Sequence, residues 1–113
     1  MRLPFIALLC LAGCSDQRAF DAAAWKADTL SDSRQWLDVR RSMIEDVARR
    51  FPPGTAKAQI VAQLGPGERQ LDCPYPDADS CLTYDLGVRS IDYDYYEFRF
   101  RRDRLVESYV RPG

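Results

Sequence analysis

The 113-residue sequence contains no histidine, and this absence excludes several kinds of chemistry. Histidine is the commonest metal ligand in proteins, the commonest general base and the usual pH switch near neutrality. The sequence also lacks an excess of positive charge, because 16 Lys and Arg residues stand against 17 Asp and Glu residues. Binding to nucleic acid depends on such an excess. We therefore expect no nucleic-acid partner.

No other constellation typical of an enzyme takes the place of histidine. There is no S-x-x-K motif that would pair a serine nucleophile with a base. Asp77 and Asp79 lie in a loop near two cysteines, and Asp92 and Asp94 lie in a tyrosine-rich loop, so neither pair is expected to be buried as acid–base catalysis requires. A Ca²⁺ site at Asp92 and Asp94 would need six or more oxygen ligands. We expect a non-catalytic protein with no metal and no cofactor.

Long hydrophobic runs are also absent, since crossing a bilayer as a helix takes about 20 apolar residues. A short apolar run follows Arg2 and is typical of a secretory signal. It ends in Leu11-Ala12-Gly13-Cys14, which is similar to a bacterial lipobox, where the cysteine thiol accepts diacylglycerol and the chain is cut before it. We expect residues 1–13 to be the signal peptide and Cys14 to carry the lipid. The alternative is an ordinary secretory signal with an incidental cysteine.

The residue after Cys14 is Ser15 rather than aspartate, which in the lipoprotein sorting pattern resembles an outer-membrane destination. Several acyl chains on one residue make a stable anchor, because each buried methylene contributes roughly 0.8 kcal/mol. Residues 14–32 are polar and alanine-rich, and we interpret them as a tether that docks through Phe20 and Trp25. The expected location is the periplasmic side of a bacterial outer membrane, with residues 33–113 as the single folded domain.

Two cysteines remain in the domain, Cys73 and Cys81. An even pair in an oxidising compartment predicts a disulfide. The chain-entropy model gives about 2.5 kcal/mol for so short a loop. The alternative is a redox or metal pair, but the spacing is not C-x-x-C and neither histidine nor another cysteine can complete a site.

Periodicity predicts two helices. Over 33–50 the apolar residues, Trp36 and Leu37 among them, form one broad arc that ends before Pro52, and Arg40 falls in the middle of it. A buried guanidinium needs a partner. Arg40 is expected to form an internal ion pair, with snorkelling or ligand binding as alternatives. A second helix is expected from a Thr55 cap to Leu64, ending at Gly65.

The remaining sequence alternates as β-strands do, over 81–86, 95–101 and 105–110, with a loop over 87–94. A three-residue turn would place Phe100 opposite Val106, Tyr96 opposite Val110 and Arg99 opposite Glu107. A two-residue turn would place Glu107 on the core face and is therefore rejected. In strand 95–101, Glu97, Arg99 and Arg101 are expected to face water. The predicted fold is α+β, with two helices packed on one face of a three-stranded antiparallel meander.

The segment Gly54-Thr55, followed by Ile60, Val61 and Leu64-Gly65-Pro66, resembles the signature of the SmpA/OmlA family. These are small outer-membrane lipoproteins and include BamE of the β-barrel assembly machinery. The resemblance covers roughly residues 33–110. It implies an α-α-β-β-β domain that acts as an accessory or scaffolding module in envelope assembly.

Candidate partner-binding residues are Ile91, Tyr93 and Tyr95 in the aromatic loop, and Arg99 and Arg101 in the basic run that continues to Arg102 and Arg104. Tyrosine buries a large area at low entropy loss, and arginines attract acidic partners or anionic lipid. The first functional hypothesis is a lipid-anchored scaffold with a protein partner in the envelope. The second is an anchored inhibitor or ligand-binding protein that acts on a secreted enzyme, and the third is an enzyme that uses carboxylates.

Overall fold

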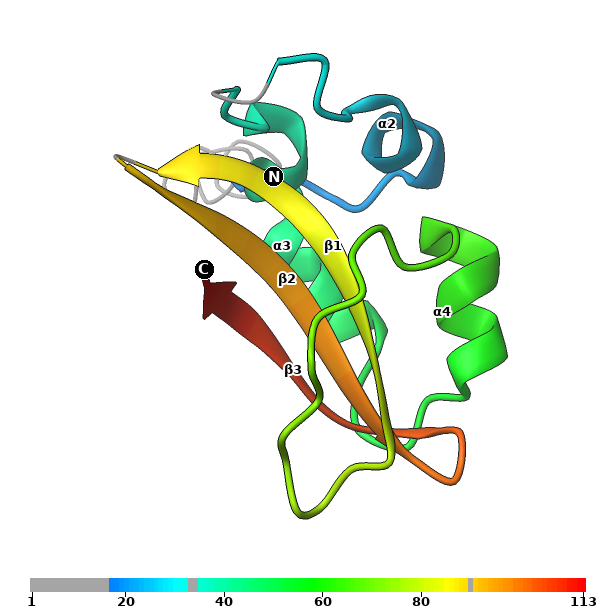
Figure 1. Ribbon diagram of the computed structural model, residues 1–113. Coiled ribbons are helices and arrows are strands. Elements are labelled where there is room, and N and C mark those ends of the chain that lie inside the picture. The colour runs from blue at the N-terminus through cyan, green and yellow to red at the C-terminus, as the bar shows by residue number, and fades with distance from the viewer. Residues whose placement is uncertain (1–16, 33–34, 90) are drawn as a thin grey trace, which may run out of the picture.

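The computed structural model describes residues 17–32, 35–89 and 91–113, so the predicted signal peptide and the predicted lipid site at Cys14 lie outside the described residues. Figure 1 shows three helices followed by one antiparallel sheet with strand order β1-β2-β3. This confirms the predicted α+β class and the meander. The elements are α2 (Ala22–Ala27), α3 (Asp38–Arg50), α4 (Lys57–Leu64), β1 (Ser80–Arg89), β2 (Asp92–Arg101) and β3 (Arg104–Pro112).

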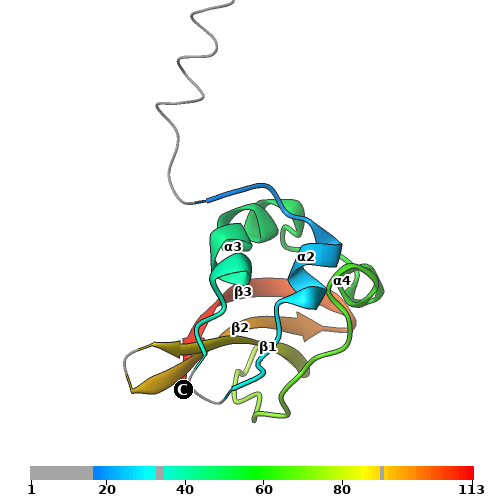
Figure 2. The same cartoon turned by 90° about the horizontal axis from the view of Figure 1, so that it is seen from above.

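The helices lie on one face of the sheet, as Figure 2 shows from above. Between the two layers is the apolar core, in which aromatic rings from the helical segments meet rings from β1 and β2 at nearly right angles, a preferred arrangement for aromatic pairs. The fully buried large residues of this core include Trp25, Met43, Val47, Phe51, Ile60, Tyr84, Leu86, Phe98 and Phe100.

The segment predicted as a tether is part of the folded body from Gln17 onward. Trp25, on α2, has no exposed surface and belongs to the core, and Phe20 packs against it from the edge. Asp21 caps α2 by accepting a hydrogen bond from the Ala24 amide at 3.1 Å. The expected docking of both aromatics is therefore confirmed, but α2 is a third helix that was not predicted.

Helix α3 begins at Asp38, five residues later than predicted. The residues before it run beside β1: the Leu37 amide donates to the Leu86 carbonyl, and the Val88 amide donates to the Gln35 carbonyl. Gly87 allows this close approach, since its φ is +89° and a Cβ atom there would overlap the Gln35 carbonyl oxygen. Trp36 therefore does not belong to the apolar face of α3 as predicted, and 42% of the Trp36 residue is exposed.

Helix α4 begins at Lys57, and the predicted cap at Thr55 is wrong. Ala56 occupies the N-cap position, while the Thr55 hydroxyl donates instead to the Pro52 carbonyl at 2.6 Å and closes the preceding turn. The predicted end of the helix is confirmed, because Gly65 has a positive φ of 89°.

The strands are longer than predicted, and the expected loop over 87–94 is wrong. A register shift between Asp85 and Gly87 lets β1 continue to Arg89, and β2 already begins at Asp92. Arg89 and Asp92 are paired, so only two residues separate the strands in the sequence. Consequently Tyr93 and Tyr95 lie on a strand rather than in a loop.

The β2–β3 hairpin has a two-residue turn, so the predicted three-residue turn is wrong. Tyr96 pairs with Val110 and Arg99 with Glu107 as predicted, but Phe100 pairs with Leu105 instead of Val106. A bulge between Arg99 and Phe100 inserts one residue and restores the core-facing register. Both turn residues are non-glycine with positive φ, 51° at Arg102 and 61° at Asp103.

Replacing this turn by Asn-Gly is expected to stabilise the protein. Asn and Gly adopt the left-handed region more readily than Arg and Asp, so Arg102→Asn with Asp103→Gly should raise the free energy of unfolding by about 1 kcal/mol. Urea unfolding followed by circular dichroism measures the change. Arg101→Asn, on the strand, is the control and should not stabilise. An unchanged or lower midpoint for the double variant would contradict left-handed strain at the turn.

Candidate functional site

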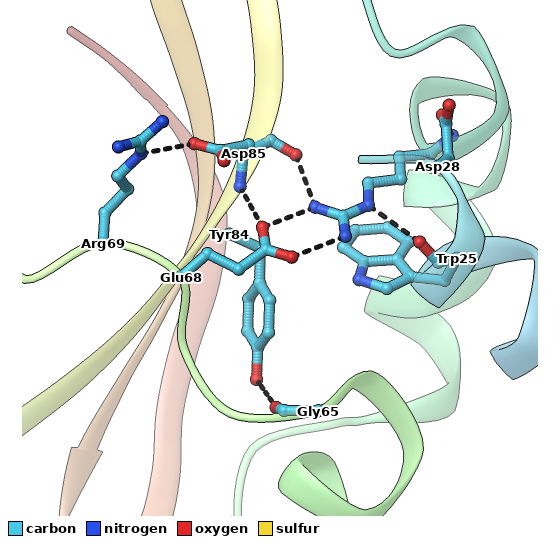
Figure 3. Close-up of polar contacts among 8 residues, drawn as sticks. Trp25, Asp28, Gly65, Glu68, Arg69, Tyr84 and Asp85 are labelled. Carbon is cyan, nitrogen blue, oxygen red and sulfur yellow. Dashed lines mark hydrogen bonds and ion pairs between the residues drawn. The ribbon is translucent and has the colours of Figure 1, made fainter. Parts of the chain in front are cut away.

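Arg40 is completely buried and has three partners from different parts of the chain (Figure 3). Its two terminal nitrogens form a bidentate pair with the Glu68 carboxylate, both at 2.7 Å. Nε donates to the Trp25 carbonyl at 2.9 Å, and Nη1 also donates to the Asp85 carbonyl at 2.9 Å. The guanidinium carbon lies 4.9 Å from the centre of the Trp25 ring. The predicted internal ion pair is confirmed.

The partner carboxylate is equally well satisfied. Burial opposes ionisation of Glu68, but hydrogen bonds from Arg40 and from the Asp85 amide outweigh burial and lower the pKa of the Glu68 carboxyl. Beside it, Arg69 donates to the Asp85 carboxylate at 2.8 Å. With every charged group paired, this cluster joins α2, α3, β1 and the segment after α4. Its role is structural.

Arg40→Met is expected to reduce the free energy of unfolding by at least about 2 kcal/mol, because Glu68 would remain charged without its partner. The folded pKa of Glu68 is lowered, so the stabilisation is complete above the ordinary glutamate pKa of about 4.3 and disappears as the pH falls through the lower folded value. Urea titrations at several pH values would measure both effects. Arg49→Met, at an exposed position, is the control, with an expected loss below about 0.5 kcal/mol.

If Arg40→Met unfolded with the same midpoint and the same acid dependence as the control, the ion pair would contribute nothing to stability.

The outer face of the sheet is covered by the loop over 66–79 (Figure 2). Glu97 on β2 was predicted to face water, but it is fully buried under this loop. Its carboxylate accepts hydrogen bonds from Tyr75 at 2.6 Å, Thr83 at 3.0 Å, Tyr109 at 3.0 Å and Arg111 at 2.7 Å. Four donors replace the water that the carboxylate loses. The alternation of apolar and polar residues correctly placed Glu97 on the face of β2 opposite the core, but it did not predict the loop that covers this face.

Arg99 completes this polar network. Its guanidinium forms a bidentate pair with Asp77 from the loop at 2.9 and 3.0 Å and a further ion pair with Glu107 at 3.0 Å. The Tyr75 and Tyr109 rings lie 5.2 and 5.5 Å from the guanidinium carbon. Burial, together with the hydrogen bond to Tyr75, raises the pKa of the Tyr109 phenol. Arg99 therefore holds the loop on the sheet.

The predicted disulfide between Cys73 and Cys81 is present, with the two Cα atoms 5.8 Å apart. It ties the loop to the start of β1.

Replacing both cysteines by alanine is expected to lower the free energy of unfolding by about 2.5 kcal/mol. Hydrogen exchange should become faster over 72–79 and remain slow in α3. Dithiothreitol should reproduce both effects in the native protein and leave the alanine variant unchanged. A reduced protein as stable as the oxidised one would contradict a structural role.

The five predicted partner-binding residues do not form one surface. Ile91 is 88% exposed in the β1–β2 turn, and Tyr93 and Tyr95 stack with ring centres 6.4 Å apart on the adjoining part of β2. Arg99 lies two residues before the end of β2, on the outer face of the sheet, and is paired with Asp77 and Glu107. Arg101 is exposed at the opposite end of β2.

At that opposite end, cations gather without acidic partners. Among the described Lys and Arg residues, most have a carboxylate within 4.0 Å. The described ones that lack such a carboxylate are Arg18, Lys26, Lys57, Arg101, Arg102 and Arg104. The last four come together where the β2–β3 turn meets the start of α4, and we refer to Lys57, Arg101, Arg102 and Arg104 as the basic end.

The basic end borders an open cleft of about 480 Å³ between the β2–β3 turn and α4. Its floor and walls include the small apolar side chains of Ala56, Ala58 and Val61. Asp103 is the acidic residue in the lining, and its carbonyl accepts a hydrogen bond from the Lys57 amide at 2.9 Å. The cleft therefore combines a positive rim with apolar walls, which suits an anionic surface or group.

The arginines of this end form a run that is evident in the sequence, whereas Lys57 and the cleft were not predicted. The contact depends on the register bulge and on a bridge between Ala56 and Arg104, and neither has a sequence signal. The predicted basic run also included Arg99, which belongs instead to the outer-face network.

Within residues 17–32, 35–89 and 91–113 there is no group of three or more Cys, Asp or Glu side chains placed to hold a metal ion. No helix in this described part is long and apolar enough to span a bilayer. Comparisons with protein-family models, curated proteins and solved structures found no match to this chain.

Proposed function

We propose that this chain is a non-catalytic, lipid-anchored outer-membrane lipoprotein that faces the periplasm and serves as a protein-interaction module in envelope assembly. The anchor is supported by the lipobox-like Leu11-Ala12-Gly13-Cys14 and by Ser15 after it. A disulfide between Cys73 and Cys81 agrees with an oxidising compartment.

The observation that carries the proposal is the basic end. Electrostatic complementarity steers association and selects partners. In a chain with net charge −1, cations are easily neutralised internally, and most of the described ones are. Three cations without a carboxylate partner, Lys57, Arg102 and Arg104, line one cleft, and Arg101 is paired with Arg104 beside it. Together they form a localised positive surface. We infer that this surface binds an acidic patch on a protein of the envelope.

The backbone at the turn supports the same interpretation. Arg102 and Asp103 occupy left-handed conformations that favour Asn and Gly, at a cost of roughly 1 kcal/mol. The Arg102 side chain contributes no hydrogen bond to the fold, whereas its amide donates to Asp79 at 2.9 Å. An arginine at a strained backbone position, whose side chain has no hydrogen bond or ion pair with the described residues, supports a role in binding an external partner.

A photo-crosslinking amino acid at Ala58 tests the proposal in intact cells. Ala58 is exposed and lines the cleft, and Ala48 on α3 is an equally exposed control position. We expect Ala58 to capture a specific envelope protein and Ala48 not to capture it. Arg102→Glu should reduce the capture about tenfold, since a charge reversal at an electrostatic interface costs more than 1 kcal/mol. Raising the ionic strength should weaken the capture as well.

Lys26→Glu is the matched control, because Lys26 is another exposed cation without an ion pair, on α2. It should leave the capture from Ala58 unchanged. An integral outer-membrane protein as the captured partner supports the assembly role, whereas a secreted hydrolase would favour the anchored-inhibitor hypothesis. Equal capture from both positions, or capture indifferent to Arg102→Glu, contradicts a partner site at the basic end.

A further inference from the structure

We propose that the face of α3 around Gln17 and Trp36 lies directly on the lipid surface, with the Trp36 indole in the interfacial layer of the membrane. The inference rests on the lipid anchor at Cys14 that forms part of the proposed function. It goes further by assigning the orientation of the domain and the residues that contact lipid.

The first step is the short distance along the chain between the anchor and the folded body. Gln17 is already fixed on α3, because its side chain donates to the Arg41 carbonyl and accepts from the Glu45 amide, both at 3.2 Å. The Arg18 amide donates to the Ser42 carbonyl at 2.7 Å. Two residues lie between Cys14 and Gln17 in the sequence, and the three steps from one Cα atom to the next span at most about 11 Å in an extended chain. A lipidated Cys14 at the membrane therefore holds this part of α3 within about 11 Å of it.

The second step is the character of the face that the anchor brings to the membrane. Gln17 and Trp36 line a common cleft of about 450 Å³ with Asp38, Arg41 and Ser42. Trp36 is 42% exposed, although it is one of the largest apolar side chains in the protein. Tryptophan is enriched at the level of the lipid headgroups because its ring is amphipathic. An exposed indole beside the anchor has the chemistry of an interfacial contact.

The third step is the rigid presentation of this indole. The Arg41 guanidinium carbon lies 3.6 Å from the centre of the Trp36 ring. Arg41 is itself fixed by the Leu86 carbonyl at 3.1 Å and by Asp94 at 3.3 Å. The ring is therefore supported from below, and its free surface points outward. Little side-chain entropy is lost when such a preorganised ring enters the headgroup layer.

The charges around this face favour contact with lipid rather than with an acidic or a basic protein. Asp38 and Glu45 are exposed acidic residues of α3, and Asp94 lies behind them as the partner of both Arg41 and Arg89. The exposed Arg18, which has no ion pair within the described residues, supplies the third positive charge. The face is thus nearly neutral overall, and both signs of charge can meet the phosphate and amine groups of phospholipids. The basic end, in contrast, lies at the other end of the sheet, at the β2–β3 turn (Figure 1).

Quenching of tryptophan fluorescence by brominated lipid tests the proposal. The chain has two tryptophans, and Trp25 is fully buried, so it reports on the core. The full lipidated protein would be reconstituted in phosphatidylcholine vesicles whose acyl chains carry bromine near the headgroup. We expect the emission of Trp36, measured in Trp25→Phe, to fall roughly twofold relative to vesicles without bromine, as interfacial placement requires. In Trp36→Phe, the emission of Trp25 should hardly change.

If Trp25→Phe fails to fold, the same quantity is the difference in quenching between the native protein and Trp36→Phe. Intact mass and flotation with the vesicles report on the anchor independently. A protein that carries acyl chains and floats, but whose Trp36 emission is unaffected by bromine, overturns the lipid-contact proposal and leaves the anchor intact. A protein without acyl mass, which stays in solution as a Cys14→Ser control does, overturns both proposals.

Discussion

The bidentate pair between Arg40 and Glu68 is the interaction on which the arrangement of the helices and the sheet depends. A guanidinium enters an apolar interior only if its donors find acceptors. Here the acceptors come from α2, from the segment after α4 and from β1, so each of these segments must occupy one position for the charge to be satisfied. Hydrophobic contacts alone do not define orientation so closely, because they are non-directional. The ion pair thus adds a directional constraint to the core.

The same pair sets the path of the chain over the outer face of the sheet. Glu68 is fixed by Arg40, and its amide donates to the Thr83 carbonyl at 2.8 Å, so the chain leaves α4 along the edge of β1. From there the loop crosses the polar face, where Tyr75 and Asp77 meet Glu97 and Arg99. The sheet consequently has two covered faces, one apolar and one polar. The disulfide secures the second cover, which has no hydrophobic core of its own.

Local regularities predicted a large part of this fold, and tertiary contacts account for what they missed. Periodicity placed Arg40 in the apolar arc, but its partner Glu68 lies 28 residues away in an irregular segment, where no pattern indicates which carboxylate faces inward. Alternation along β2 predicted the two faces correctly and yet left Glu97 exposed, since the loop that covers it follows no periodic rule. Single-residue irregularities at Gly87 and at Arg99 changed the strand lengths and the turn. Such bulges depend on tertiary packing, so a strict two-residue alternation of apolar and polar residues does not predict them.

The candidate functional surfaces were predictable only as far as they are local. The run of arginines at the β2–β3 turn is evident from the sequence, whereas Lys57 joins it through the bridge between Ala56 and Arg104. Trp36 fits the apolar arc of a helix, and it became an exposed residue because the backbone around it pairs with β1 at Gly87. In both cases, the position of the side chain depends on a backbone bridge between the residues just before a helix and an edge strand of the sheet.

The separation of the two surfaces has a physical consequence for partner binding. A single anchor leaves a domain free to rotate, and much of that freedom is lost when a partner binds. In the proposed arrangement, a second contact at Trp36, on the side where Gln17 joins α3, would remove rotational freedom in advance and would leave the basic end directed away from the lipid. A partner in the same membrane would then meet the cations of Lys57 and Arg102 in a constant orientation and at a high effective concentration. A modest electrostatic surface would suffice under these conditions, and the cleft offers such a surface: a few cations without carboxylate partners rather than a large apolar patch.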